Sequence, residues 1–174
     1  MADLREGDFY YGAILSHCFN QGICPLLIEG KGKKNRRLYD CTTNEGNFKL
    51  FAKYRSAPNK SEKEGYNSWQ FSFSDKDIAE LTQFKDEKGE LSLGLVCGKE
   101  SLCDSEIAFL NKEEIASLLE RGKNSVTISH KTGEKNFRVH VGGGRKMPCR
   151  SAVIDLTEQI GTLPVSESLE RLLF

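Results

Sequence analysis

Residues 36–55 read RRLYDCTTNEGNFKLFAKYR, and they carry the clearest structural signal in the chain. Two runs suited to strands, 36–43 and 47–55, flank a turn whose residues, Asn-Glu-Gly at 44–46, are typical of a tight connection. The second run alternates apolar and polar residues, as a strand with one buried face does. The stretch therefore predicts a β-hairpin.

Helical and extended patterns continue on both sides of this hairpin. Apolar residues recur at helical spacing after Asp8, which can cap a first helix that ends before Gly22. Ser74, with Asp77 three residues later, forms a capping box at the start of another helix. Strands are also predicted at 25–29, 69–73, 91–97, 106–110, 125–130 and 136–141, and helices at 112–120 and around 169–173. The order predicts an α+β fold, α/β-like in character: a central mixed β-sheet with flanking helices, an α-β-β-β-α-β-like N-terminal core and a C-terminal hairpin.

Length and composition suit one globular domain over residues 1–174. The chain has 174 residues, with 25 basic and 25 acidic side chains and 38% hydrophobic residues, which is enough to bury a core. No run approaches the roughly 20 apolar residues of a membrane-spanning helix, and residues 1–8 lack the pattern of a secretory signal. The six cysteines lie among apolar residues without zinc-site spacing. We therefore expect reduced thiols, a cytoplasmic location and no membrane association.

The charges are segregated along the chain although their sum is zero. Residues 31–60 hold nine basic and two acidic side chains, and residues 121–150 hold eight and one. Residues 61–120 hold six basic and fourteen acidic side chains. If the two basic segments share a face, they form a patch that attracts a polyanion such as nucleic acid. The alternative is that segments of opposite sign neutralise one another across the fold.

Asp40 and Lys53 lie on the two strands of the predicted hairpin. Together with the order of elements over about residues 8–97, they resemble the PD-(D/E)xK nuclease superfamily, which has the restriction endonuclease-like fold. The resemblance implies that both residues are catalytic: Asp40 would hold Mg²⁺, and Lys53 would stabilise developing charge or orient the attacking water. The chain departs from the family motif at Phe51, where an acid or amide is expected. A replacement ligand would have to come from Glu6, Asp8, Glu29 or Gln70.

The same hairpin also suggests binding without catalysis. Its four candidates for contacting nucleic-acid phosphates are Arg36, Arg37, Lys49 and Arg55. Aromatic residues between them provide rings for stacking on bases, although such charges can also serve only to solubilise a sheet edge. The sequence thus predicts a nucleic-acid-associated protein: either a diverged Mg²⁺-dependent nuclease or a relative that has lost its metal site. The alternative is a non-catalytic module that binds nucleic acid, or a protein partner through the acidic segment.

Overall fold

The computed structural model describes residues 3–29, 36–59, 64–133, 137–140 and 147–151. The predicted hairpin is confirmed as β2 (Arg37–Thr43) and β3 (Gly46–Arg55). Its antiparallel register places Thr43 opposite Gly46 and Asp40 opposite Lys49. Gly46 has a φ of 153°, a backbone conformation that glycine adopts without the steric cost of a side chain.

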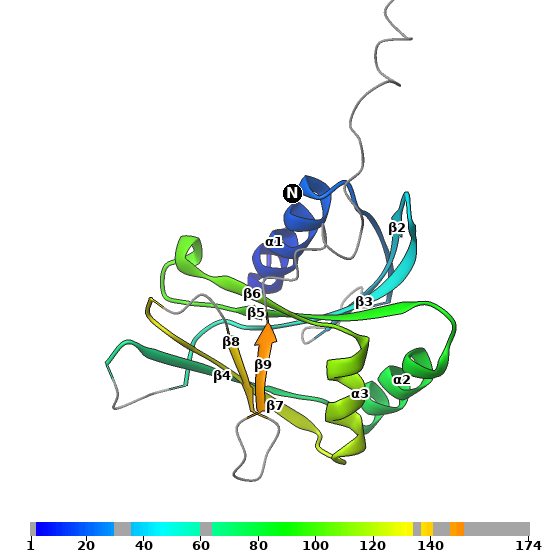
Figure 1. The fold of residues 1–174 in the computed structure, drawn as a ribbon. Coiled ribbons are helices and arrows are strands. Elements are labelled where there is room, and N and C mark those ends of the chain that lie inside the picture. The colour runs from blue at the N-terminus through cyan, green and yellow to red at the C-terminus, as the bar shows by residue number, and fades with distance from the viewer. Residues whose placement is uncertain (1–2, 30–35, 60–63, 134–136, 141–146, 152–174) are drawn as a thin grey trace, which may run out of the picture.

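Among the described residues, five strands form the central mixed sheet that the sequence predicts (Figure 1). Their order is β1 (Cys24–Glu29), β2, β3, β5 (Glu90–Cys97) and β6 (Glu106–Leu110). β3 and β5 are parallel, and the other neighbours are antiparallel. A parallel pair requires a crossover connection, which here contains β4 and the helix α2 (Asp75–Asp86).

Four further strands of the described part form a second, antiparallel sheet, which the sequence pattern does not separate from the first. Its order is β4 (Tyr66–Ser72), β7 (Ser125–Lys131), β8 (Phe137–His140) and β9 (Met147–Ser151). β4 joins this sheet because its buried aromatic residues, Trp69 and Phe71, pack in the core between the two sheets. β9 is not among the predicted strands. The helix predicted around residues 169–173 lies outside the described residues.

Helices cover both faces of the central sheet (Figure 1). α1 (Glu6–Asn20) lies on one face, where Tyr11, Ile14 and Cys18 pack against residues of β2, β3 and β5. On the other face, α2 and α3 (Lys112–Glu120) pack together with the second sheet. α2 begins with the predicted capping box of Ser74 and Asp77. Successive buried residues of β2, β3, β5 and β6 therefore enter two different cores.

The described helices and cysteines bear on two of the expectations from the sequence. None of the described helices is long and apolar enough to cross a membrane. Five cysteines are free thiols: Cys18, Cys41 and Cys97 are buried, whereas Cys24 and Cys103 are exposed. The expectation that the cysteines are reduced stays a prediction.

Candidate nucleic-acid interface

The hairpin distributes the predicted site residues over both faces of the central sheet. Consecutive residues of an extended chain point to opposite faces, so Arg36 and Arg37 are separated in space. Arg37 pairs with Ala52, on the face that α1 covers. Lys53 points to the other face and contacts α2. The predicted site is consequently divided among a buried ionic cluster, a small pocket around Asp40 and a larger pocket beside α1.

The buried ionic cluster lies at the N-terminal end of α2, and its members are Glu29, Arg36, Lys53, Asp77 and Glu80. Arg36 Nη2 lies 2.9 Å from Glu29 Oε2, its Nη1 lies 3.2 Å from Asp77 Oδ1, and the same guanidinium pairs with Glu80. Lys53 Nζ donates a hydrogen bond to Asp77 Oδ2 at 2.9 Å. Arg36, Lys53 and Asp77 are only 5%, 8% and 4% exposed. Their charges therefore bind one another inside the fold and do not face solvent.

Asp77 remains ionised within this cluster. Burial by itself raises the pKa of a carboxyl group. The hydrogen bonds from Lys53 and from the backbone of Ser74, together with the charge of Arg36, outweigh burial and hold the pKa of Asp77 below its ordinary value. The Lys53 ammonium group therefore has Asp77 as its ion-pair partner in the folded protein.

Asp40 lies elsewhere, opposite Lys49. Lys53 is four residues further along β3, about 13 Å away at the rise of a strand, so the structure does not bring Asp40 and Lys53 together. Asp40 and Lys49 line a pocket of 170 Å³ with Glu87 and Glu90. No group of three His, Cys, Asp or Glu side chains within the described ranges could hold a metal ion. The side chains around Asp40 do not fit the Mg²⁺ site that the PD-(D/E)xK resemblance implies, and the resemblance stays a prediction.

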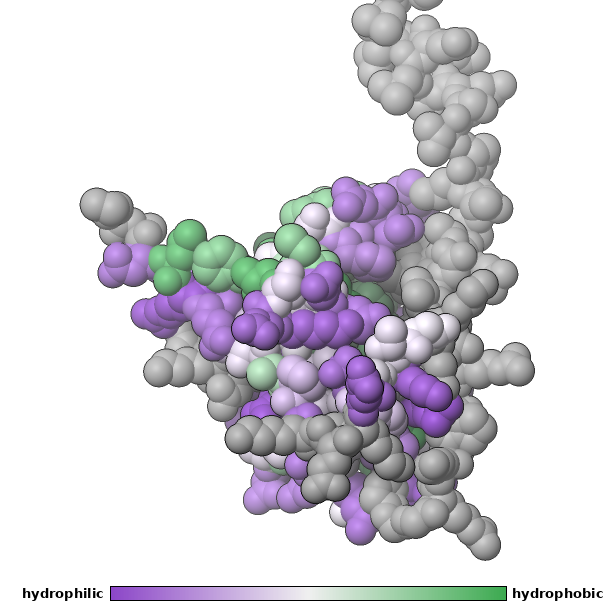
Figure 2. All heavy atoms as spheres, turned by 90° about the vertical axis from the view of Figure 1, so that its left-hand side faces the viewer, coloured by the Kyte–Doolittle hydropathy of each residue, from purple (hydrophilic) through white to green (hydrophobic). Residues whose placement is uncertain are grey.

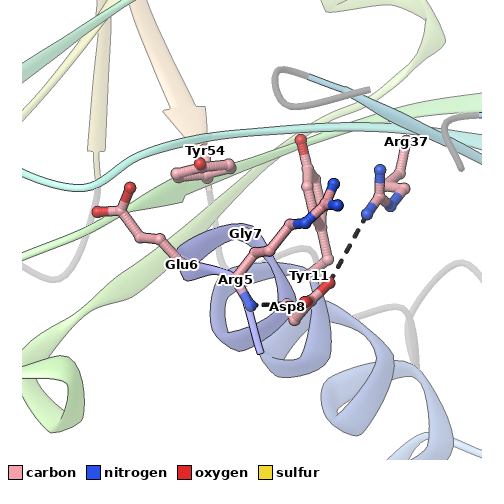
Figure 3. A pocket seen from close by; sticks show the side chains of 7 residues that line it. All are labelled: Arg5, Glu6, Gly7, Asp8, Tyr11, Arg37 and Tyr54. Atoms are coloured by element: carbon pink, nitrogen blue, oxygen red, sulfur yellow. Dashed lines mark hydrogen bonds and ion pairs between the residues drawn. The ribbon is translucent and has the colours of Figure 1, made fainter. Parts of the chain in front are cut away.

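A pocket of 520 Å³ lies at the N-terminal end of α1, against β2 and β3 (Figure 3). We call it the Arg–Tyr pocket. Its lining residues are Arg5, Glu6, Gly7, Asp8 and Tyr11 from α1 and the residue before it, Arg37 from β2 and Tyr54 from β3. The volume falls within the range of about 300–1,000 Å³ that is usual for small-ligand sites. Two guanidinium groups and two phenol rings meet here, which makes the pocket the candidate binding site.

Arg37 is held at the wall of this pocket by a ring and a carboxylate. Its guanidinium carbon lies 4.8 Å from the centre of the Tyr11 ring, within the range of a cation–π interaction. Its Nη2 lies 3.8 Å from Asp8 Oδ1, and Asp8 Oδ2 accepts a hydrogen bond of 2.9 Å from the backbone N–H of Arg5. Asp8 thus connects the backbone of Arg5 to the side chain of Arg37 (Figure 3).

Tyr11 contributes a hydroxyl group that lacks a hydrogen-bond partner. The residue is 3% exposed, and its Oη is the buried side-chain polar atom of the described residues for which no partner is found. Leaving such a group unsatisfied costs about 1–3 kcal/mol. Burial raises the pKa of Tyr11 far above its ordinary value, although the charge of Arg37 opposes this shift. The hydroxyl is therefore protonated at neutral pH and able to donate a hydrogen bond.

Tyr54 forms the opposite wall of the pocket. Its ring stacks on Tyr10, with ring centres 4.9 Å apart, and meets Tyr11 edge to face at 5.4 Å. Burial and the nearby carboxylate of Glu6 raise the pKa of Tyr54. Gly7 lies close to these rings, and a Cβ at this position would be in van der Waals contact with both Tyr11 and Tyr54, at 3.4 Å. Side chains from three separate elements are thereby fixed around one space.

The assignment of this pocket depends on its geometry. No family model, curated protein or solved structure matches this chain. A function for this pocket is therefore inferred from the contacts, burial and charges of the described residues.

Of the four predicted phosphate contacts, only Arg37 lines the Arg–Tyr pocket. Arg36 is buried in the ionic cluster. Lys49 Nζ lies 5.1 Å from the centre of the Phe84 ring. Arg55 is exposed at the end of β3. The structure therefore supports one member of the predicted set as a pocket residue.

The side chains of Arg5 and Tyr11 were not predicted for this pocket, whereas Tyr54 is one of the hairpin aromatic residues that the sequence offers for stacking on bases. A signal for Tyr54 exists in the hairpin, because Arg37 pairs with Ala52 and a residue two positions further along β3 shares that face. Arg5 and Tyr11 depend on where α1 packs. No local sequence pattern predicts where α1 packs on the sheet.

A second hollow beside α1 differs in being apolar. It measures 240 Å³ and includes Phe9, Ala13, Leu102 and Ile107 in its lining, which contains no charged side chain. Phe9 and Leu102 are each 52% exposed, and Figure 2 shows apolar side chains gathered along the upper part of this face. This groove offers nothing to neutralise a phosphate, so it is not part of the candidate interface.

Proposed function

We propose that this protein is a nucleic-acid-binding module without metal-dependent catalysis, and that the Arg–Tyr pocket holds a phosphate of the bound strand. One observation carries the proposal: two guanidinium groups, those of Arg5 and Arg37, converge on a single pocket whose wall includes the rings of Tyr11 and Tyr54. Guanidinium groups bind phosphate through charge and paired hydrogen bonds. The N-terminus of α1, which borders the pocket, adds partial positive charge.

The remaining predicted residues favour binding over cleavage. Arg36 and Lys53 already have buried carboxylate partners. Withdrawing one member of such a pair costs about 3–5 kcal/mol, so recruiting Lys53 for catalysis would disrupt the fold. A cytoplasmic location belongs to the same proposal and is supported by the buried free thiols of Cys18, Cys41 and Cys97.

The pocket also sets the expected salt dependence. Each neutralised phosphate of a single strand contributes about −0.7 to the slope of log affinity against log salt concentration. The single phosphate held by Arg5 and Arg37 leads us to expect a slope of about −0.7. A broad basic face would give a much steeper slope.

Fluorescence anisotropy with single-stranded and duplex oligonucleotides tests the proposal, at salt concentrations of about 50–200 mM. The diagnostic variant is Arg37→Glu. The matched control is Lys123→Glu, because Lys123 is exposed and follows α3, which packs on the opposite face of the central sheet. We expect Arg37→Glu to weaken binding about tenfold or more, equivalent to about 1.4 kcal/mol, and the control to leave binding unchanged.

Two results would contradict the proposal. Equal losses in Arg37→Glu and Lys123→Glu would mean that charge acts without a specific site. Failure of the wild-type protein to bind any strand would exclude nucleic acid and favour a protein partner.

The same oligonucleotides, incubated with Mg²⁺, Mn²⁺ or EDTA, test the nuclease prediction. The proposal expects intact strands under all three conditions. Metal-dependent cleavage that disappears in Asp40→Ala would contradict it and restore the nuclease hypothesis. Lys49→Ala and Lys53→Ala would then identify which lysine acts with Asp40.

A further inference from the structure

We infer that the Arg–Tyr pocket takes the terminal phosphate monoester of a nucleic-acid strand, and that Asp8 competes with this phosphate for Arg37. The inference rests on the proposed function, because it assigns the ligand group of the same pocket. It is argued from the contacts of Asp8, the formal charges of the lining and the two guanidinium groups.

Asp8 holds Arg37 loosely. The closest oxygen to nitrogen distance is 3.8 Å, and the Asp8 side chain is 42% exposed. By contrast, Arg36 lies 2.9 Å from Glu29 and 3.2 Å from Asp77, whose side chain is 6% exposed. Exposed ion pairs contribute only about 0–1 kcal/mol. An incoming anion can therefore replace Asp8 at small cost, whereas the partners of Arg36 cannot be replaced in this way.

The formal charges of the lining cancel. Arg5 and Arg37 contribute two positive charges, and Glu6 and Asp8 contribute two negative charges. A ligand with a single negative charge thus gains little over the carboxylate already present. A terminal phosphate carries about −1.5 to −2 at pH 7 and offers three strong acceptor oxygens. This stronger anion is the one able to displace Asp8.

The pocket supplies several donors for these three oxygens. The guanidinium groups of Arg5 and Arg37 both line it, and each carries several N–H groups. A phosphate inside a strand has two of its oxygens esterified and leaves fewer acceptors. The end of a strand can also enter a confined pocket of 520 Å³ without both neighbouring nucleotides having to pass through it.

The test compares strands of one sequence that carry a 5′-phosphate, a 3′-phosphate or hydroxyl groups at both ends, with the label placed internally. We expect the wild-type protein to prefer one phosphorylated end by about tenfold. The preference should disappear in Arg37→Ala. It should also shrink from pH 7.5 to pH 5.5, because the second pKa of a phosphate monoester is about 6.

Asp8→Asn should change the affinity for the phosphorylated end in the opposite direction from Arg37→Ala. Asparagine keeps a side-chain oxygen for the backbone N–H of Arg5 but removes the competing charge, so binding of the phosphorylated end should tighten about threefold to tenfold. The matched control is Asp86→Asn, since Asp86 is 68% exposed at the end of α2. If Asp8→Asn perturbs the far-ultraviolet circular dichroism spectrum, Asp8→Ser replaces it, because serine also accepts a hydrogen bond at a helix start.

Each outcome separates the inference from the proposed function. Equal affinity for phosphorylated and unphosphorylated strands would overturn the inference and leave nucleic-acid binding intact, whereas no binding to any strand would overturn both. Inorganic phosphate that displaces the strand at comparable concentration would show that the pocket takes the free anion and would overturn the assignment to a strand end. Unchanged binding in Asp8→Asn would overturn the competition by Asp8.

Discussion

Arg36 and Arg37 are adjacent in sequence and occupy opposite environments. Arg36 is buried on the α2 face, with three carboxylate partners that belong to the fold. Arg37 lies on the α1 face, where its contact with Asp8 is long and its ring contact with Tyr11 borders an open pocket. A charge with close, buried partners serves stability, whereas a charge whose ion pair is long and half-exposed can exchange that carboxylate for a ligand. Arg36 in the ionic cluster is an example of the first kind of charge, and Arg37 in the Arg–Tyr pocket is an example of the second. Both arginines belong to the same hairpin region.

The largest expected effect compares the two arginines directly. Arg36→Met leaves the carboxylates of Glu29, Asp77 and Glu80 without their shared cation, so we expect it to lower the free energy of unfolding by about 3–5 kcal/mol. Arg37→Met should lower it by less than about 1 kcal/mol. Urea unfolding followed by circular dichroism measures both. Equal costs for the two variants would break the comparison.

A second prediction concerns the pH dependence of the ionic cluster. Because the pKa of Asp77 is lowered in the folded protein, its contribution to stability is present above the carboxyl pKa of the unfolded chain and is lost as the pH falls towards the folded value. Asp77→Asn should therefore cost about 2–3 kcal/mol at pH 7, and the difference from wild type should shrink between about pH 5 and pH 3.

Unfolding measured at several pH values provides the check. Asp86→Asn, at an exposed position on the same helix, is the control and should show a small difference at every pH. A difference between wild type and Asp77→Asn that stayed constant from pH 7 to pH 3 would show that Asp77 does not act through its charge.

The smallest expected effect concerns the pocket. Tyr11→Phe removes a buried hydroxyl that has no partner among the described residues, so it should stabilise the protein by about 1 kcal/mol and leave strand binding unchanged. Tyr10→Phe is the matched control, since the Tyr10 hydroxyl donates a hydrogen bond of 3.3 Å to the carbonyl oxygen of Ser56, and its loss should destabilise the protein by about 0.5–1 kcal/mol. The same sign for both stability changes would show that the Tyr11 hydroxyl is satisfied.

The elements of the fold were predictable where their signals are local. The turn at residues 44–46 specifies the hairpin, and Ser74 with Asp77 specifies the start of α2. The division into two sheets was not predictable in this way, because it depends on which distant strands cover Trp69 and Phe71. Alternating apolar residues show that a strand has a buried face, but they do not identify the neighbour that buries it.

Within the candidate site, only the contacts that follow from the register of the hairpin were predictable from the sequence. Thr43 lies opposite Gly46 across the turn, so the turn length already pairs Asp40 with Lys49, four residues away from Lys53. The partners of Arg36 are different in kind: Glu80 is 44 residues away and is brought close by the packing of α2. No local sequence pattern predicts that contact.

The central claim is that the Arg–Tyr pocket, and not the ionic cluster, contacts nucleic acid. Its most direct test is a nuclear magnetic resonance titration of ¹⁵N-labelled protein with a terminally phosphorylated single strand, following the Nε–Hε signals of the arginine side chains. We expect the signals of Arg5 and Arg37 to shift together as the strand saturates the protein, while the signal of Arg36 stays in place. Binding that shifts Arg36 and leaves Arg5 and Arg37 unchanged would contradict it.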